Sequence, residues 1–324
     1  ATAVAGGCLG GRACHGSEAV VMFSRAFSRG GLCHRFVTFN RGQPGLCHGF
    51  VTFNRGLSIA KKNPIRPPLL LILDLDETLV RVACKDVHKN RKLERVDFNV
   101  LVEVPAYPNP MTYDCGVAVR PGLDTFLGWI KERRSAGAIE GPWIFTTATP
   151  SFVKAILRNI DPAGAIFGLR VLTRGACTPT RMPGYLLKDL SRVKSSFKSG
   201  IESQRKVLID NSPISCIHDP GNAVLVRDWL GSTAPDTELA RVQSVIDSAI
   251  DKIASQAQED ASANYSGCVA SLIPGHANFQ KRLQELGTKL NGDVPKEVDQ
   301  LRTTLRLLVS ECNDIKRDLL GAAP

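Results

Sequence analysis

Two aspartates, Asp74 and Asp76, stand directly after the apolar run Leu69 to Leu73. A short, continuous apolar run predicts a strand that is buried on both faces of a parallel sheet. Side chains two positions apart on an extended segment point the same way, so both carboxylates can reach one centre while Leu75 turns into the core. One carboxylate can attack a phosphate ester to give an aspartyl-phosphate, and the other can act as general acid and then as general base.

A cation is expected at this aspartate pair because two neighbouring carboxylates repel each other. Mg²⁺ prefers oxygen ligands, keeps several waters and orients a phosphoryl group for in-line displacement. We therefore expect Mg²⁺ as cofactor. The alternative interpretation is that Asp76 only caps the helix that follows.

Alternating strands and helices are predicted to position these carboxylates. Further short apolar strands are predicted at Trp143 to Phe145, Val207 to Ile209 and Ala223 to Val226. A hairpin is predicted from Val96 to Val104 and Cys115 to Val119, and helices are predicted at Leu123 to Arg133 and Ser151 to Arg158. This alternation indicates an open α/β sheet, whose ligands bind at the carboxyl ends of the strands.

The segment Asp74-Leu-Asp-Glu-Thr-Leu-Val80 resembles the first motif of the phosphatases that act on the RNA polymerase carboxyl-terminal domain, within the haloacid dehalogenase superfamily. Further blocks resemble the family in the same order: Val119-Arg-Pro-Gly, Phe145-Thr-Thr-Ala-Thr, Lys188-Asp-Leu-Ser-Arg, Leu208-Ile-Asp-Asn-Ser-Pro, His218-Asp-Pro-Gly-Asn-Ala and Asp236-Thr-Glu-Leu. The blocks extend over about half of the chain. The resemblance implies the α/β fold of that superfamily, an open Rossmann-like parallel sheet with a small β-hairpin insertion.

The same resemblance implies roles for individual residues. Asp74 would be the nucleophile, Asp76 the general acid and base, Thr146 a ligand of the phosphoryl group, and Lys188 the cation that balances the transferred phosphate. Thr146 follows the predicted strand that ends at Phe145, so it is expected at the same sheet edge as Asp74.

The metal site implied by the resemblance takes the Asp74 side chain, the main-chain carbonyl of Asp76 and Asn211, with Asp210 supporting them. Asp210 and Asn211 follow the predicted strand that ends at Ile209, which again brings them to this edge. The resemblance also implies substrate contacts by two further residues, Thr78 and Arg174.

The chain departs from the family pattern in a long segment from Arg81 to Arg95, in extra residues before Lys188 and in its C-terminal part. These departures affect the walls that select a substrate. The main hypothesis is a phosphatase that removes phosphate from serine or threonine in proteins. A non-catalytic receptor is one alternative, because the receptor subunit of the mitochondrial inner-membrane translocase carries a similar domain. A small-metabolite phosphatase is the other, although such enzymes usually carry a substantial cap domain.

Charge and hydropathy exclude several classes of protein. The net charge is +10, but residues 1–73 hold nine Lys and Arg and one acid, which leaves 32 basic and 30 acidic residues in the remainder. A nearly neutral domain gives no indication of direct nucleic-acid binding. No apolar run reaches 18 residues, so we expect no membrane span. The ten cysteines contain no Cys-x-x-Cys pair, which favours reduced thiols inside the cell over a disulfide framework.

Three regions are predicted along the chain: a basic leader at residues 1–65, the phosphatase domain at residues 66–255 and a helical tail at residues 256–324. We expect no regular structure in the leader, in which Gly31 to Gly42 recurs as Gly45 to Gly56. Its Arg-rich, acid-free stretch from Met22 is typical of a transit peptide, which favours a mitochondrial location. The alternatives are an unstructured basic tail and a location in the nucleus or cytosol.

The C-terminal tail carries apolar residues at steps of three and four, the heptad pattern of a coiled coil or a helical hairpin. The pattern leaves two hypotheses open. The helices can bind a partner or a second copy of the chain, or they can fold back onto the domain. The heptad positions are Val294, Val298, Leu301, Leu305, Leu308, Cys312, Ile315 and Leu319.

Overall fold

The computed structural model of the chain describes residues 21–28, 31–38, 68–84, 92–104, 109–194, 205–256, 270–272 and 275–321. Two compact units are present, residues 1–62 and residues 63–324. In the first unit, strands β1 (Val21–Ser28) and β2 (Gly31–Thr38) pair as an antiparallel hairpin. This hairpin lies where the sequence analysis expected no regular structure. The rest of the expected leader, including the second copy of the repeat, lies outside the described residues.

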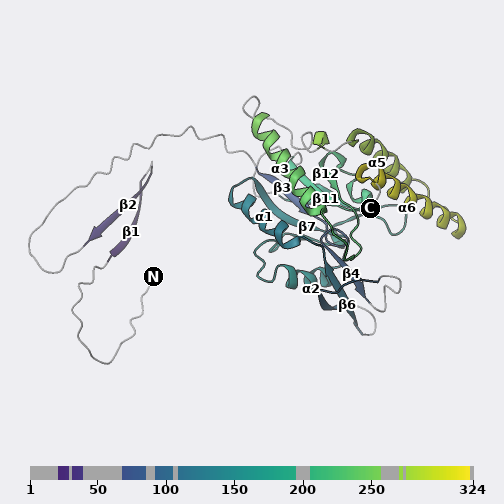
Figure 1. Ribbon diagram of the computed structural model, residues 1–324, viewed down its shortest axis with the longest axis horizontal. Coiled ribbons are helices and arrows are strands. Elements are labelled where there is room, and N and C mark those ends of the chain that lie inside the picture. The colour runs from purple at the N-terminus through teal and green to yellow at the C-terminus, as the bar shows by residue number, and fades with distance from the viewer. Residues whose placement is uncertain are drawn as a thin grey trace, which may run out of the picture. The chain divides into compact units, whose positions relative to one another are not determined.

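The second unit contains a five-stranded parallel sheet, which confirms the predicted α/β class (Figure 1). The strand order is β12-β11-β3-β7-β8, so β3 lies in the middle. The strands are β12 (Ala223–Leu225), β11 (Lys206–Asp210), β3 (Leu69–Leu73), β7 (Ile139–Phe145) and β8 (Val171–Leu172). The central position of β3 brings its carboxyl end next to those of β11 and β7.

Strand β3 has apolar side chains on both faces, and each face packs into a different core. Leu69, Leu71 and Leu73 contribute to one core, whereas Leu70 and Ile72 contribute to the other. Successive side chains of a strand point to opposite faces, so a strand buried on both sides needs an unbroken apolar run. The predicted buried strand is therefore confirmed with the bounds expected from the sequence.

The first core is covered by helices α1 (Leu123–Ser135), α2 (Pro150–Ile160) and α3 (Glu238–Gln256), together with a three-stranded antiparallel sheet. That sheet has the order β4-β6-β5, with β4 (Val80–Cys84), β6 (Met111–Val119) and β5 (Phe98–Val104). The predicted hairpin corresponds to β5 and β6. Strand β4 was missed because its pairing with β6 joins residues from Cys84 and Cys115 to Val80 and Val119, far apart in sequence, which local periodicity does not show.

A disulfide joins Cys84 to Cys115 across β4 and β6. The two residues stand opposite each other in the register of this strand pair. The sequence analysis expected reduced cysteines, because the spacing of the ten cysteines suggests no pairing. Only the register of a pair of strands distant in sequence brings these two together.

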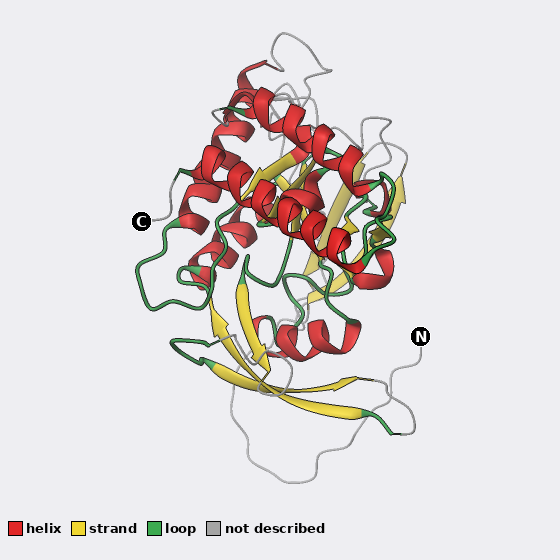
Figure 2. Cartoon of the chain, turned by 90° about the vertical axis from the view of Figure 1, so that its right-hand side faces the viewer, coloured by secondary structure: helices red, strands yellow, loops and turns green. Residues whose placement is uncertain are grey.

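The second core is covered by helices α5 (His276–Leu290) and α6 (Val298–Leu320), which lie side by side (Figure 1). Viewed from the side in Figure 2, helices lie in front of the strands of the sheet. Four buried side chains of α5 and two of α6 join Leu70 and Ile72 in this core: Phe279, Leu283, Leu286, Leu290, Leu308 and Ile315. The C-terminal helices thus fold back onto the domain and belong to the same compact unit as the sheet.

Most of the heptad positions of the tail contact this second core. Leu301, Leu305, Cys312 and Leu319 are partly buried against it, whereas Val298 at the start of α6 is 63% exposed. The apolar seam is therefore satisfied within the chain, and a coiled coil with a partner is not supported. Among the described residues, no helix is long and apolar enough to cross a membrane.

The packing of α6 predicts different outcomes for two substitutions on this helix. Ile315 is 1% exposed and Leu307 is 66% exposed. Ile315→Ala should lower the free energy of unfolding by about 2–5 kcal/mol, because it leaves a cavity. Leu307→Ala should change it by less than about 0.5 kcal/mol, as expected of a surface substitution.

Urea unfolding of both variants at two protein concentrations checks this prediction. If the seam instead held a dimer together, the Ile315→Ala effect would depend on concentration, and the packing of α6 on its own domain would be contradicted.

Candidate active site

Three adjacent strands deliver polar residues to one edge of the sheet. Asp74 follows β3, Thr146 follows β7 and Asp210 ends β11. The main-chain N–H of Asp74 donates to the carbonyl of Ile209 at 2.9 Å, which continues the strand pairing and sets Asp74 beside Asp210. Lys188 follows β10 (Leu186–Leu187), a short strand that pairs with β9 (Thr178–Pro179).

Lys188 lies between two buried carboxylates. Its Nζ donates to Asp74 Oδ1 at 2.6 Å and to Asp210 Oδ2 at 2.5 Å. The side chains of Lys188 and Asp210 are each 1% exposed, and that of Asp74 is 8% exposed. Buried charges need such pairing, because an isolated ion loses its hydration on burial. The structure thus brings together three of the residues that the sequence analysis selected.

The environment shifts the pKa values of this group. Burial raises the pKa of the Asp74 carboxyl to about 7; the charge of Lys188 opposes this shift, and that of Asp210 adds to it. Burial alone would lower the pKa of Lys188, but the carboxylates of Asp210 and Asp74 outweigh it and raise that pKa. The two carboxylates therefore favour the charged form of Lys188. A strongly perturbed carboxyl in a cavity marks a candidate functional group.

Asp74 and Lys188 lie at the base of a cavity of about 670 Å³. Asp76, Thr146 and Arg174 also line it. Asp76 Oδ1 accepts from the main-chain N–H of Val82 at 3.3 Å, which connects it to the middle of β4. Arg174 is exposed on the cavity wall, where its Nε donates to the carbonyl of Thr147 at 2.8 Å. All three residues line the same cavity as Asp74.

Thr78 lies beside Asn211 in the interior of the domain. Its side chain is fully buried and is not part of the cavity lining. Its hydroxyl donates to Asn211 Oδ1 at 3.3 Å. Thr78 therefore supports Asn211, and its expected contact with a substrate stays a prediction.

Asn211 is oriented by two carboxylates that the sequence analysis did not select. Its Nδ2 donates to Asp228 Oδ1 at 2.7 Å and to Glu77 Oε2 at 3.1 Å. Glu77 has a positive φ of 64° and forms an ion pair with Arg81. A non-glycine residue with positive φ is uncommon and often lies at a functional site. Sequence patterns give no sign of that backbone conformation, although Glu77 is part of the first motif.

The chemistry of the cavity lining fits Mg²⁺, which binds through oxygen atoms. Asp74 offers a carboxylate oxygen, Asp76 a main-chain carbonyl oxygen and Asn211 an amide oxygen, and all three residues line the cavity. Among the described residues, no group of three or more His, Cys, Asp and Glu side chains forms a metal cluster. The expected Mg²⁺ ligand set differs from such a cluster, because it combines one carboxylate side chain with an amide and a main-chain carbonyl.

Comparison with protein families gives a match over residues 69–258 to the NLI interacting factor-like phosphatases. The chain belongs to this family. The match covers more than half of the chain, including every site residue described above, and it confirms the resemblance found in the sequence.

Several known proteins are similar to this NLI interacting factor-like domain. The carboxy-terminal domain RNA polymerase II polypeptide A small phosphatase 2 of Mus musculus is 32% identical over 179 residues, which are 55% of this chain and 56% of that protein. A probable C-terminal domain small phosphatase of Dictyostelium discoideum is 32% identical over 180 residues, 56% of this chain and 50% of that protein. The chain therefore spans about half the length of these relatives. The structure of Fcp1, an essential RNA polymerase II CTD phosphatase, has a TM-score of 0.44 at 16% identity and covers 63% of this chain and 70% of that one.

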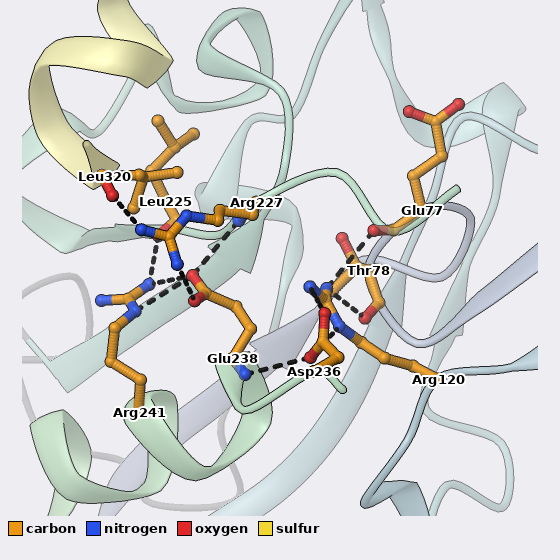
Figure 3. Close-up of polar contacts among 9 residues, drawn as sticks. All are labelled: Glu77, Thr78, Arg120, Leu225, Arg227, Asp236, Glu238, Arg241 and Leu320. Atoms are coloured by element: carbon orange, nitrogen blue, oxygen red, sulfur yellow. Dashed lines mark hydrogen bonds and ion pairs between the residues drawn. The ribbon is translucent and has the colours of Figure 1, made fainter. Parts of the chain in front are cut away.

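A buried ion pair fixes the loop that carries Glu77 in this NLI interacting factor-like domain (Figure 3). Arg120 Nε and Nη2 donate to the two oxygens of Asp236 at 3.0 and 2.9 Å. Arg120 Nη1 also donates to the carbonyls of Thr78 at 3.1 Å and Glu77 at 3.5 Å. Two of the family blocks found in the sequence thus meet here, although no role could be assigned to Arg120 or Asp236 from the sequence.

The Arg120 side chain is fully buried and that of Asp236 is 17% exposed. Asp236→Asn keeps the shape of the side chain but leaves Arg120 without its counter-charge, which should cost about 3–5 kcal/mol of stability. A matched control is Asp299→Asn, which removes one charge of an exposed pair with Arg302. The control should cost less than about 1 kcal/mol. Chemical unfolding of the two variants measures both values, and equal losses would contradict the role given to the buried pair.

Proposed function

We propose that this chain is a Mg²⁺-dependent phosphatase that removes phosphate from serine or threonine side chains of proteins through an aspartyl-phosphate on Asp74. The observation that carries the proposal is the position of Lys188 between Asp74 and Asp210 at the base of the cavity. Membership of a phosphatase family supports it further. When bound, Mg²⁺ would offset the negative charge of the carboxylates and the phosphate.

In the first half-reaction, a carboxylate oxygen of Asp74 attacks the phosphorus of the substrate and the bond to the serine or threonine oxygen breaks. Asp76 donates a proton to that leaving oxygen. Lys188 stabilises charge on the transferred phosphoryl group, and Thr146 contributes a polar contact to it. Arg174, on the cavity wall, is suited to bind the phosphate of the incoming substrate.

In the second half-reaction, Asp76 accepts a proton from a water molecule that attacks the phosphorus of the aspartyl-phosphate. The bond between phosphorus and the Asp74 oxygen breaks, which releases inorganic phosphate and restores the carboxylate. The two aspartates therefore have different tasks, one covalent and one in proton transfer.

The cavity wall supports a protein substrate. Val102, Val104 and Tyr113 of the antiparallel sheet and Phe152 of α2 line the cavity beside the polar residues at its base. A wall of this kind can bind apolar side chains that flank a phosphorylated residue, whereas a small polar metabolite makes little use of it. The names of the small phosphatases among the relatives are consistent with this substrate class.

The two aspartates should fail in different ways when each is replaced by asparagine. Asp74→Asn removes the nucleophile, so no phosphoenzyme should form at any pH. Asp76→Asn keeps the nucleophile but lacks the proton donor. Compared with the wild-type chain, its phosphoenzyme formation should therefore fall less with p-nitrophenyl phosphate, whose leaving group needs no proton, than with a phosphoserine peptide. Rapid-quench measurement of the phosphoenzyme on both substrates checks this.

Equal loss on both substrates would show that Asp76 is not the general acid. A wild-type chain that forms no phosphoenzyme but binds the phosphopeptide would contradict the catalytic proposal and favour the non-catalytic receptor.

Lys188→Met should have opposite effects on metal binding and turnover. Loss of a positive charge beside Asp74 and Asp210 should tighten Mg²⁺ binding, while turnover should fall by more than about tenfold, because the transferred phosphate loses its counter-charge. Lys194→Met, which removes an exposed lysine, is the control for net charge. Mg²⁺ titration and steady-state kinetics of both variants check the prediction; a folded Lys188→Met protein with full turnover would rule out the role of Lys188.

A further inference from the structure

The C-terminal helix α6 reaches the candidate metal ligand Asn211 through two charged side chains. Lys316 Nζ donates to Asp228 Oδ1 at 2.7 Å and to Asp228 Oδ2 at 2.9 Å. Asp228 Oδ1 in turn accepts from Asn211 Nδ2 at 2.7 Å. Lys316 lies well beyond residue 258, where the family match ends. The contact therefore comes from a part of the chain that does not belong to the family domain.

Asp228 decides which way the amide of Asn211 faces. An ionised carboxylate can only accept hydrogen bonds, so the NH₂ group of Asn211 must face Asp228 and Glu77. The amide oxygen then points to the other side, where it accepts from Thr78. This is the oxygen that a Mg²⁺ ion would need. Mutation of a residue that orients a metal ligand in this way commonly lowers the metal affinity by about 10- to 100-fold.

Lys316 holds Asp228 in place. Its side chain is 19% exposed, and it contacts both oxygens of the carboxylate, which fixes the rotation of that group. A second contact anchors the same end of α6, because Arg227 Nη2 donates to the carbonyl of Leu320, one turn after Lys316 (Figure 3). Arg227 is also paired with Glu238 of α3. The segment that carries Asp228 is thus fixed between α3 and α6.

We propose that Lys316 and Asp228 are positioning residues for the metal site, and that α6 is therefore part of the active-site structure of this chain. The inference rests on the proposed function, because it assigns Asn211 to Mg²⁺. It predicts that a substitution on the C-terminal helix changes Mg²⁺ affinity although Lys316 touches no proposed metal ligand.

Charge alone and positioning predict opposite results for Lys316→Met. Removing a cation near a Mg²⁺ site should tighten binding by electrostatics. If Lys316 acts by positioning Asp228, binding should instead become weaker. Lys316→Arg, which keeps the charge and the donors, should retain most of the affinity. Lys289→Met is the matched control. It removes the ion pair of Lys289 on α5 with Glu311 on α6, and it changes the net charge by the same amount as Lys316→Met.

Calorimetric titration of Mg²⁺ into the metal-free, full-length chain tests the proposal. We expect a dissociation constant about tenfold higher for Asp228→Ala, a smaller increase for Lys316→Met, and no change for Lys289→Met. In the Asp228→Ala background, Lys316→Met should have no further effect. Thermal unfolding without metal verifies that each variant is folded.

Unchanged or tighter binding by Lys316→Met, while the wild-type chain binds Mg²⁺, would overturn this inference and leave the proposed function intact. A wild-type chain that binds no Mg²⁺ would overturn both. An equal loss of Mg²⁺ affinity in Lys316→Met and Lys289→Met would show that Lys316 acts only through the general packing of the helices. That result would likewise contradict the proposal.

Discussion

Burial of Lys188 together with Asp74 and Asp210 brings three charged groups out of water within hydrogen-bond reach of one another. Such a group is tolerated only where each charge has a partner in good geometry. The sheet provides that geometry, because Asp74 follows β3, Asp210 ends the neighbouring strand β11, and Lys188 follows β10. The apolar strands, the helices on both faces and the paired charges therefore depend on one another.

The cover of the sheet is divided between two parts of the chain. Helices α1 and α3, within the family domain, cover one face, whereas α5 and α6, beyond it, cover the other. The second pair contributes six buried side chains to the core that also contains Leu70 and Ile72. Because apolar burial is the main driving force of folding, the C-terminal helices belong to the fold of this chain and are no separate tail.

Local patterns in the sequence were sufficient to predict the central strands and the helices α1 and α2, since each depends on neighbours close in sequence. Thr146, Lys188 and Asp210 lie far from Asp74 in the sequence, and they were selected by the resemblance to the family. Features that depend on distant pairing were not predictable in this way. Strand β4 and the Cys84–Cys115 bond arise from the register with β6. The contact of Lys316 with Asp228 joins residues 88 positions apart. The heptad pattern of α6 was seen correctly, but periodicity shows only that a face is apolar and not what covers it.

The positive φ of Glu77 has a consequence for the order in which the molecule loses structure. Such a conformation costs about 1–3 kcal/mol in a non-glycine residue. Here the carbonyl of Glu77 is held by Arg120 and by the main-chain N–H of Trp229, from two other parts of the chain. The loop that shapes the cavity is therefore kept in place by elements that must already be assembled. Local opening should reach this loop at a lower free energy than it reaches β3, so the cavity should lose its shape while the sheet persists.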